Sequence, residues 1–306
     1  MKERFSNGGG SMIRALMILA AAFFVMIIFG GSLAVWTGGF FSPGGRESYL
    51  AQSAVQSVVV FIGTAIVAAS IVSRRPFSYL GMSERVSWRP FLGVVCVYIL
   101  AFPFLNQLIW WNSQLTLPES MAGLESAMRQ MEEMNGKISE IILSTGSVGG
   151  LISGVLIIGV LTGLGEEMLF RGMLQRSMNI YSRMGQWSIW IAAVIFSAAH
   201  MQFFGFFPRL LLGAFFGYLL YSTGSLWPSV FAHALNNSIV VVSYWLAVRE
   251  GESPDADMLW VVKDGFPTAA VISFVQTAIF LVFSYNRLFC DCGENRDKAK
   301  EVSHGR

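Results

Sequence analysis

Long apolar segments recur along almost the whole chain, and they restrict the possible fold more than any other feature. A helix needs about 20 apolar residues to cross the hydrocarbon core of a bilayer. The chain is 54% hydrophobic and only 13% charged, whereas soluble domains carry about 25% charged residues. We therefore predict an all-α polytopic integral membrane bundle of about eight transmembrane helices, covering residues 12–36, 49–73, 90–111, 148–177, 187–201, 208–221, 226–248 and 267–289.

Two of these segments, 187–201 and 208–221, are short for a membrane span. A version with seven spans, or with a re-entrant segment, therefore stays open. The helices divide the chain into four parts. Residues 1–11 are a flexible polar N-terminus, and residues 12–147 hold the first three spans and an amphipathic helix. Residues 148–248 hold spans four to seven, and residues 249–306 hold an acidic loop, the eighth span and a charged tail.

The segment 112–147 differs from the spans around it. Its glutamates alternate with methionines and leucines at helical spacing, which predicts an amphipathic helix on the membrane surface or over a cavity mouth. Two interpretations stay open for this helix. It is either a solvated connection between spans or a lid that controls substrate access.

Lysine and arginine indicate the orientation, because they are enriched in cytoplasmic loops. With the N-terminus inside and eight spans, 14 basic residues lie inside and 6 outside, Arg171 being left out. This predicts a multi-pass protein of the cell membrane with both termini in the cytoplasm. The net charge of +2 gives no case for binding nucleic acid, so the lipid bilayer is the expected surrounding partner.

Three charged residues interrupt the fourth span, and ionisable groups at this depth indicate function. Glu167 and Arg171 are four residues apart, so they share a helix face and can pair. Glu166 points about 100° away around the helix and needs a different partner. A carboxylate without a charged partner in a desolvated cavity is suited to general acid–base chemistry.

Two of the three histidines lie in later apolar segments and are the candidate partners of Glu166. His200 follows Phe196 by one helical turn, so the Phe196 ring can hold the imidazole rotamer. His233 and Asn237 are also one turn apart and share a face. Amide hydrolysis requires a base for water, a proton donor for the leaving amine and donors to the oxyanion. An imidazole and the Asn237 amide could supply such donors beside Glu166.

The ordered set Glu-Glu-x-x-x-Arg, Phe-x-x-x-His and His-x-x-x-Asn resembles the CPBP family. These are the CAAX-processing and bacteriocin-processing intramembrane proteases, also called the ABI or Rce1-type family. The motifs run from Glu166 to Asn237, and the resemblance covers residues 148–248. It implies a glutamic-type intramembrane endopeptidase that cleaves a membrane-associated peptide or protein.

The resemblance also implies a role for each motif residue. Glu166 and His200 are expected to activate water, and His233 and Asn237 to stabilise the oxyanion. Three residues support them structurally: Glu167, Arg171 and Phe196. The water-filled cavity is expected among spans four, five and seven, opening towards the cytoplasmic side where span four ends.

No cofactor is expected, although zinc stays an alternative. Glu166, His200 and His233 could form a two-histidine, one-carboxylate zinc site with an open position, but no His-Glu-x-x-His pair lies on one helix. Two other functions also stay open. Intramembrane glutamates and histidines serve proton-coupled transporters, and a non-proteolytic scaffold or bacteriocin-immunity protein could keep the motifs for structure.

Overall fold

The computed structural model describes residues 8–38, 41, 44–182, 184–251, 262–263 and 267–289, and every regular element in these ranges is a helix. Residues 1–7, most of the acidic loop and the charged tail lie outside the described residues. The first helix, α1 (Gly8–Gly38), begins four residues before the predicted start. The described end of the predicted flexible N-terminus is therefore helical.

The N-terminal half contains three long helical runs and a short helix. The second run begins as α2 (Arg46–Val55), continues through the π-helical η1 (Gln56–Gly63) and ends as α3 (Thr64–Val72). The short helix α4 (Pro76–Tyr79) was not predicted from the sequence. The third run is α5 (Arg89–Ser113), and η2 (Glu119–Met121) leads from it into the amphipathic α6 (Ala122–Leu143).

The C-terminal half begins with one long run of mixed helix type. Its parts are α7 (Val148–Gly154), η3 (Val155–Leu161), α8 (Thr162–Glu167), η4 (Met168–Gln175) and α9 (Arg176–Ser182). The segments η3 and η4 are π-helical. The remaining helices are α10 (Gln186–Ala199), η5 (Phe203–Gly205), α11 (Phe206–Thr223), α12 (Trp227–Glu250), α13 (Thr268–Ser284) and η6 (Tyr285–Phe289).

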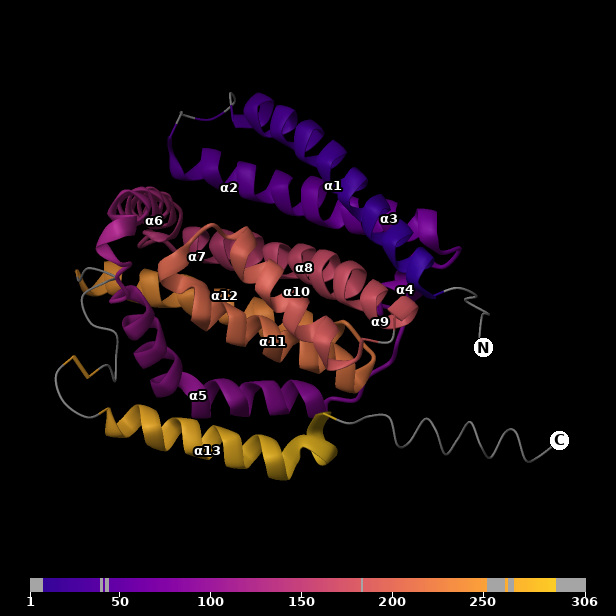
Figure 1. Cartoon of the computed structure of the whole chain (residues 1–306). Coiled ribbons are helices and arrows are strands. Elements are labelled where there is room, and N and C mark those ends of the chain that lie inside the picture. Colours follow the sequence, from indigo (N-terminus) through magenta and orange to yellow (C-terminus); the bar gives the residue numbers. More distant parts are fainter. Residues whose placement is uncertain are drawn as a thin grey trace.

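The helices between α7 and α12 form the middle of the bundle (Figure 1). Helices α1, α2 and α3 lie on one side of it, and α5 and α13 lie on the other. The start of α1 and the end of η6 lie at the same end of the bundle as α4 and α9. Both described ends of the chain are therefore on one side, and the prediction that this side is cytoplasmic stays a prediction.

Seven of the described helical runs are long and apolar enough to cross a membrane, one fewer than the eight predicted spans. The exception is α10, which has 14 residues. At 1.5 Å per residue it covers roughly 21 Å, less than the hydrocarbon core of about 30 Å. The structure is thus a multi-pass membrane bundle, and α10 is a shorter apolar helix within it.

Small residues bring α12 close to the run that carries the two glutamates. A Cβ atom at Gly163 would lie 3.1 Å from the backbone nitrogen of Ala234, and one at Gly159 would lie 2.5 Å from Oγ of Ser238. Close approach of backbones through small residues is typical of helix packing in membranes. This approach places His233 of α12 beside the glutamates of α8.

Helix α6 lies at the other end of the bundle, where it is seen end-on while most helices run across the view (Figure 1). The backbone N–H of Leu117 donates to Glu125 at 2.7 Å, and the Arg129 guanidinium lies 4.3 Å from the centre of the Phe204 ring. The Arg129 side chain also donates to Glu125, at 2.9 Å. The hydrogen bond from the Leu117 backbone, followed by the one from Arg129, lowers the pKa of Glu125. The amphipathic helix is therefore attached at a defined position at this end.

Candidate active site

Glu166 and Glu167 are the last two residues of α8, directly before the π-helical η4. The side chains of Glu167 and Arg171 are fully buried, and that of Glu166 is 10% exposed. π-Helical turns inside α-helices are rare and occur frequently at functional sites. The two carboxylates thus enter the interior of the bundle at a point of irregular helix geometry.

Glu167 and Arg171 together connect the fourth span to α12 and α11. Its Oε1 atom accepts from Nη1 of Arg171 at 2.7 Å and from Nδ1 of His233 at 2.8 Å. Arg171 also donates from Nη2 to the carbonyl oxygen of Gly213 at 3.1 Å. The i,i+4 spacing correctly indicated the Glu167–Arg171 contact, but the contact between Glu167 and His233 did not follow from the sequence.

The two imidazoles present the same atom to Glu166. Nδ1 of His200 lies 2.9 Å from the carbonyl oxygen of Phe196, and Nδ1 of His233 contacts Glu167. Each Nδ1–H is thereby engaged, and each Nε2 is directed towards Glu166. The Oε2 atom of Glu166 lies 3.9 Å from Nε2 of His200 and 3.8 Å from Nε2 of His233.

Those two distances are too long for direct hydrogen bonds. Oε2 of Glu166 is also buried without a hydrogen-bond partner among the residues that the structure describes. Polar atoms separated by more than 3.5 Å are commonly bridged by water. The arrangement therefore has room for one small polar group between the carboxylate and the two imidazoles.

Aromatic rings fix both imidazoles in place. Phe196 meets the His200 ring edge-on, with centroids 4.9 Å apart, and meets the His233 ring at 5.7 Å. On its other side, His233 is stacked on Phe216, at 5.1 Å and 21°. The Arg171 guanidinium lies 4.2 Å from the Phe196 centroid, so Phe196 touches the arginine as well as both histidines.

Asn237 lines the same cavity as His233 but is held by other groups. Its Nδ2 atom donates to the carbonyl oxygen of Ile158 at 3.2 Å, and its Oδ1 atom accepts from Asn236 at 3.2 Å. The amide orientation follows from these two contacts, and one N–H of the Asn237 amide remains for another acceptor. Asn236 also lines the cavity.

A cavity of about 410 Å³ joins these groups. All four residues predicted to be catalytic line it, as does Phe196, whereas Glu167 and Arg171 lie behind it. Its other lining residues include Ser139 of α6 and Gln202, which directly precedes η5, a segment that contacts α6. The expectation that the cavity opens where the fourth span ends is therefore wrong, because residues near Ser182 do not contribute to it.

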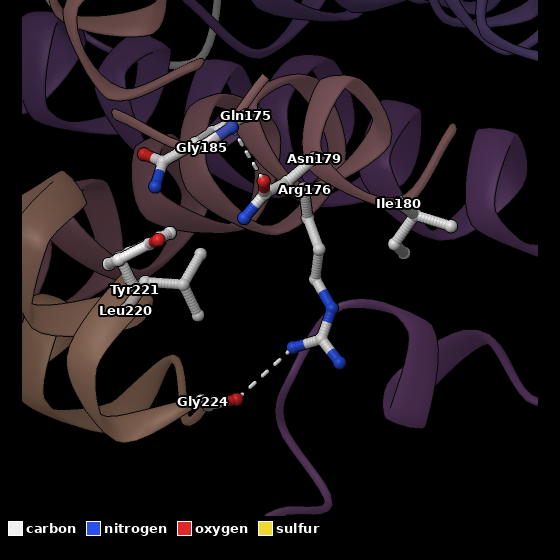
Figure 2. A pocket seen from close by; sticks show the side chains of 8 residues that line it. All are labelled: Gln175, Arg176, Asn179, Ile180, Gly185, Leu220, Tyr221 and Gly224. Atoms are coloured by element: carbon white, nitrogen blue, oxygen red, sulfur yellow. Dashed lines mark hydrogen bonds between the residues drawn. The ribbon is translucent and has the colours of Figure 1, made fainter. Parts of the chain in front are cut away.

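A slightly larger cavity, of about 460 Å³, lies at the opposite end of the same run (Figure 2). Arg176 points across it and donates to the carbonyl oxygen of Gly224 at 3.1 Å, and the backbone N–H of Gly185 donates to Asn179. None of the residues predicted from the motifs lines it. Chemistry rather than size therefore decides which cavity is the candidate active site.

Zinc binding was the alternative for Glu166, His200 and His233. In the described part of the chain, no group of three or more His, Cys, Asp or Glu residues is placed so that it could hold a metal ion. The prediction of a metal-free reaction stays a prediction, because this finding concerns geometry and not the reaction.

Several residues of the cavity were not predicted from the sequence. Phe216 and Arg209 belong to α11, which carries no motif. A usable signal was the pair Gly213 and Gly217, a Gly-x-x-x-Gly spacing that marks a face of close helix contact. A Cβ atom at Gly213 would lie 3.2 Å from Nη2 of Arg171, so this face meets the site.

A comparison with known protein families finds a match in the same part of the chain that carries the three motifs. Residues 148–239 match the family described as type II CAAX prenyl endopeptidase Rce1-like. No curated protein and no solved structure matches the chain significantly. The matched segment contains all seven predicted site residues and covers α7 to the middle of α12. The segment 148–239 is therefore similar to this family, in agreement with the resemblance found in the sequence motifs.

Proposed function

We propose that this protein is a metal-free intramembrane endopeptidase in which Glu166 activates the water that attacks the peptide bond. One observation supports this proposal most directly. The buried, unpartnered Oε2 of Glu166 lies 3.8 and 3.9 Å from two Nε2 atoms, inside the 410 Å³ cavity. A catalytic base must reach the reacting water within hydrogen-bond distance, and this gap fits one water.

His200 positions the water in this proposal. Its Nδ1–H donates to the Phe196 carbonyl oxygen, so the neutral ring carries a lone pair on Nε2. The water donates one hydrogen to Nε2 of His200 and the other to Oε2 of Glu166. Glu166 takes its proton as the water oxygen adds to the carbonyl carbon of the scissile bond, and the carbonyl π electrons move to oxygen.

His233 and Asn237 stabilise the resulting oxyanion. Glu167 holds Nδ1–H of His233 at 2.8 Å, and a carboxylate in this position orients the ring and stabilises its imidazolium form. That form donates from Nε2 to the oxyanion, and Nδ2 of Asn237 supplies a second donor. The C–N bond then breaks, the leaving amine takes the proton from Glu166, and the products are a carboxylic acid and an amine.

The substitution Glu166→Gln tests the proposal, because it keeps the size of the side chain and removes the base. Losing a general base costs typically 10²–10⁴-fold in rate. We expect a loss of this size when the purified protein in lipid nanodiscs is incubated with membrane peptides and the fragments are identified by mass spectrometry. Glu140→Gln is the matched control, because Glu140 is exposed on α6.

A rate within threefold of the unsubstituted protein would remove Glu166 from the mechanism. The transporter and scaffold alternatives are not favoured by the family match. The transporter alternative makes a different prediction, namely proton-dependent uptake into proteoliposomes that Glu166→Gln abolishes without any peptide cleavage.

A further inference from the structure

The 460 Å³ cavity between α9 and the end of α11 is separate from the candidate active site (Figure 2). Its volume lies in the range of small-ligand sites. The lining combines the polar side chains of Gln175, Arg176 and Asn179 with the apolar side chains of Ile180 and Leu220. The proposed protease mechanism uses none of these groups, so their arrangement needs its own explanation.

Arg176 gives this cavity a positive charge. Its guanidinium reaches across the cavity, and Nη1 donates to the carbonyl oxygen of Gly224 at 3.1 Å (Figure 2). A guanidinium has five N–H groups, so several of them remain available. In the described part of the chain, no carboxylate lies within ion-pair distance of Arg176 and no acidic residue lines the cavity. The exposed Glu84 acts on Arg176 electrostatically, from beyond that distance.

Gln175 adds a buried acceptor that the protein leaves unused. The residue is 2% exposed, and its Nε2 atom donates to the carbonyl oxygen of Gly217 at 3.0 Å. This contact fixes the orientation of the amide. The Oε1 atom is then buried without a hydrogen-bond partner among the described residues. Buried acceptors are normally paired, so a ligand in the cavity that carries a donor would satisfy this atom.

Two more side chains of the lining offer donors. Oδ1 of Asn179 accepts from the backbone N–H of Gly185 at 3.1 Å, which leaves the Nδ2 donor group available to a ligand. The hydroxyl group of Tyr221 is a further donor on the lining. The cavity thus combines a cation and neutral donors with one unpaired acceptor, and this set fits a phosphate ester that itself carries a donor.

Tryptophan residues place the cavity at the surface of the bilayer. Trp187 follows Gly185 by two residues and is 71% exposed, and Trp227 follows Gly224 by three residues and is 40% exposed. Tryptophan is enriched at the two interfaces between membrane and water. The cavity therefore lies at the level of the lipid headgroups.

We propose that this cavity binds the headgroup of a phospholipid that carries a hydrogen-bond donor, as phosphatidylglycerol and phosphatidylethanolamine do. Arg176 and Asn179 donate to the phosphate oxygens, since the planar fork of arginine matches two of them. The hydroxyl or ammonium group of the lipid donates to Oε1 of Gln175. Basic pockets between transmembrane helices are known to bind headgroups in this way. This lipid site goes beyond the proposed protease function and does not depend on it.

Three lipids with identical acyl chains test the headgroup class. The purified protein in mild detergent is titrated with phosphatidylglycerol, phosphatidylethanolamine or phosphatidylcholine, and the bound lipid is counted by native mass spectrometry. Phosphatidylcholine is the reference, because its quaternary ammonium has no N–H. We expect each of the other two to bind about tenfold more tightly than phosphatidylcholine. Equal affinity for all three lipids overturns the proposal.

Substitutions connect this preference to the cavity. Arg176→Gln should weaken the binding of phosphatidylglycerol about tenfold, and Arg176→Lys should restore part of it, because lysine keeps the charge without the fork. Arg74→Gln is the matched control, since Arg74 is exposed between α3 and α4, and it should change nothing. An equal loss in Arg74→Gln would show general charge attraction and overturn the site.

Gln175→Met tests the unpaired acceptor separately. It should reduce the preference for phosphatidylglycerol over phosphatidylcholine and leave the affinity for phosphatidylcholine unchanged. This ratio is measured within one sample, so a partly unfolded preparation does not imitate the expected result. An unchanged ratio would contradict the role of Oε1.

Inorganic phosphate distinguishes a lipid site from a site for soluble phosphate compounds. A millimolar excess of phosphate should leave phosphatidylglycerol bound, whereas displacement of the lipid would overturn the phospholipid assignment. The proposed protease function is tested independently, because none of these measurements uses peptide cleavage. Glu166→Gln should bind phosphatidylglycerol as the unmodified protein does, and a loss of lipid in this variant would contradict a separate site.

Discussion

Removing Arg171 should destabilise the bundle far more than removing an exposed ion pair of the same length. Nη1 of Arg171 and Oε1 of Glu167 are 2.7 Å apart, and both side chains are 0% exposed. Nζ of Lys137 and Oε1 of Glu133 are also 2.7 Å apart at i,i+4 spacing, but both side chains are 67% exposed. The two pairs therefore differ mainly in their burial.

The expected loss of stability depends on which charged group each substitution leaves without its partner. Arg171→Met fills a similar space but leaves Glu167 buried with only the His233 contact. Removing one partner of a buried pair costs about 3–5 kcal/mol, whereas a hydrogen bond between membrane helices averages about 0.6 kcal/mol. The uncompensated charge therefore dominates, and the unfolding equilibrium should shift by roughly a hundredfold or more. Lys137→Met should leave the stability unchanged.

The free energy of unfolding can be measured by titrating the purified protein from mild micelles into sodium dodecyl sulfate. The double variant Glu167→Gln/Arg171→Met makes a second test, because it removes both charges and keeps an acceptor for Nδ1 of His233. It should be more stable than Arg171→Met alone. A loss below about 1 kcal/mol for Arg171→Met, or simple additivity in the double variant, would refute this reasoning.

Two further predictions concern packing and metal. Gly213→Ala should destabilise the protein by about 1–3 kcal/mol, because its Cβ would lie 3.1 Å from the Phe196 ring and 3.2 Å from Arg171. Gly136→Ala in α6 should instead stabilise the protein by about 0.5–1 kcal/mol, because nothing lies within 4 Å of its Cβ. The unfolding titration measures both changes, and equal effects would contradict the packing argument. Cleavage should be unaffected by a metal chelator, and a loss that zinc reverses would show that the reaction needs metal.

The sequence predicted the helices well because hydropathy and the lipid solvent leave few choices. The run that carries Glu166 begins at Val148 as predicted, and the short segment before His200 is a separate helix. The predicted segment 187–201 was short for a membrane span, so the sequence alone left the number of spans open. The helix in the structure is also short, with 14 residues. The predicted amphipathic segment 112–147 was too long, because α5 continues to Ser113 and α6 begins only at Ala122.

The contacts between helices were only partly predictable. A helical repeat shows that Glu166 and Glu167 face different directions, but it does not show which helix each one meets. The i,i+4 rule predicts Glu167–Arg171 because both residues lie on one helix. The contact between Glu167 and His233 joins residues 66 positions apart, and it depends on the close approach of α12 at Gly159 and Gly163.

That contact changes the interpretation of Glu167. If Arg171 were its only partner, the pair would simply be a neutral support for the helix. Because one carboxylate oxygen accepts from both Arg171 and His233, the pair also holds the imidazole of His233, and Glu167 fixes the direction of Nε2. In the proposed mechanism, this salt bridge, which costs desolvation energy in the interior, therefore orients the imidazole that donates to the oxyanion. The two adjacent glutamates then have separate tasks, because Glu167 holds His233 and Glu166 lines the cavity.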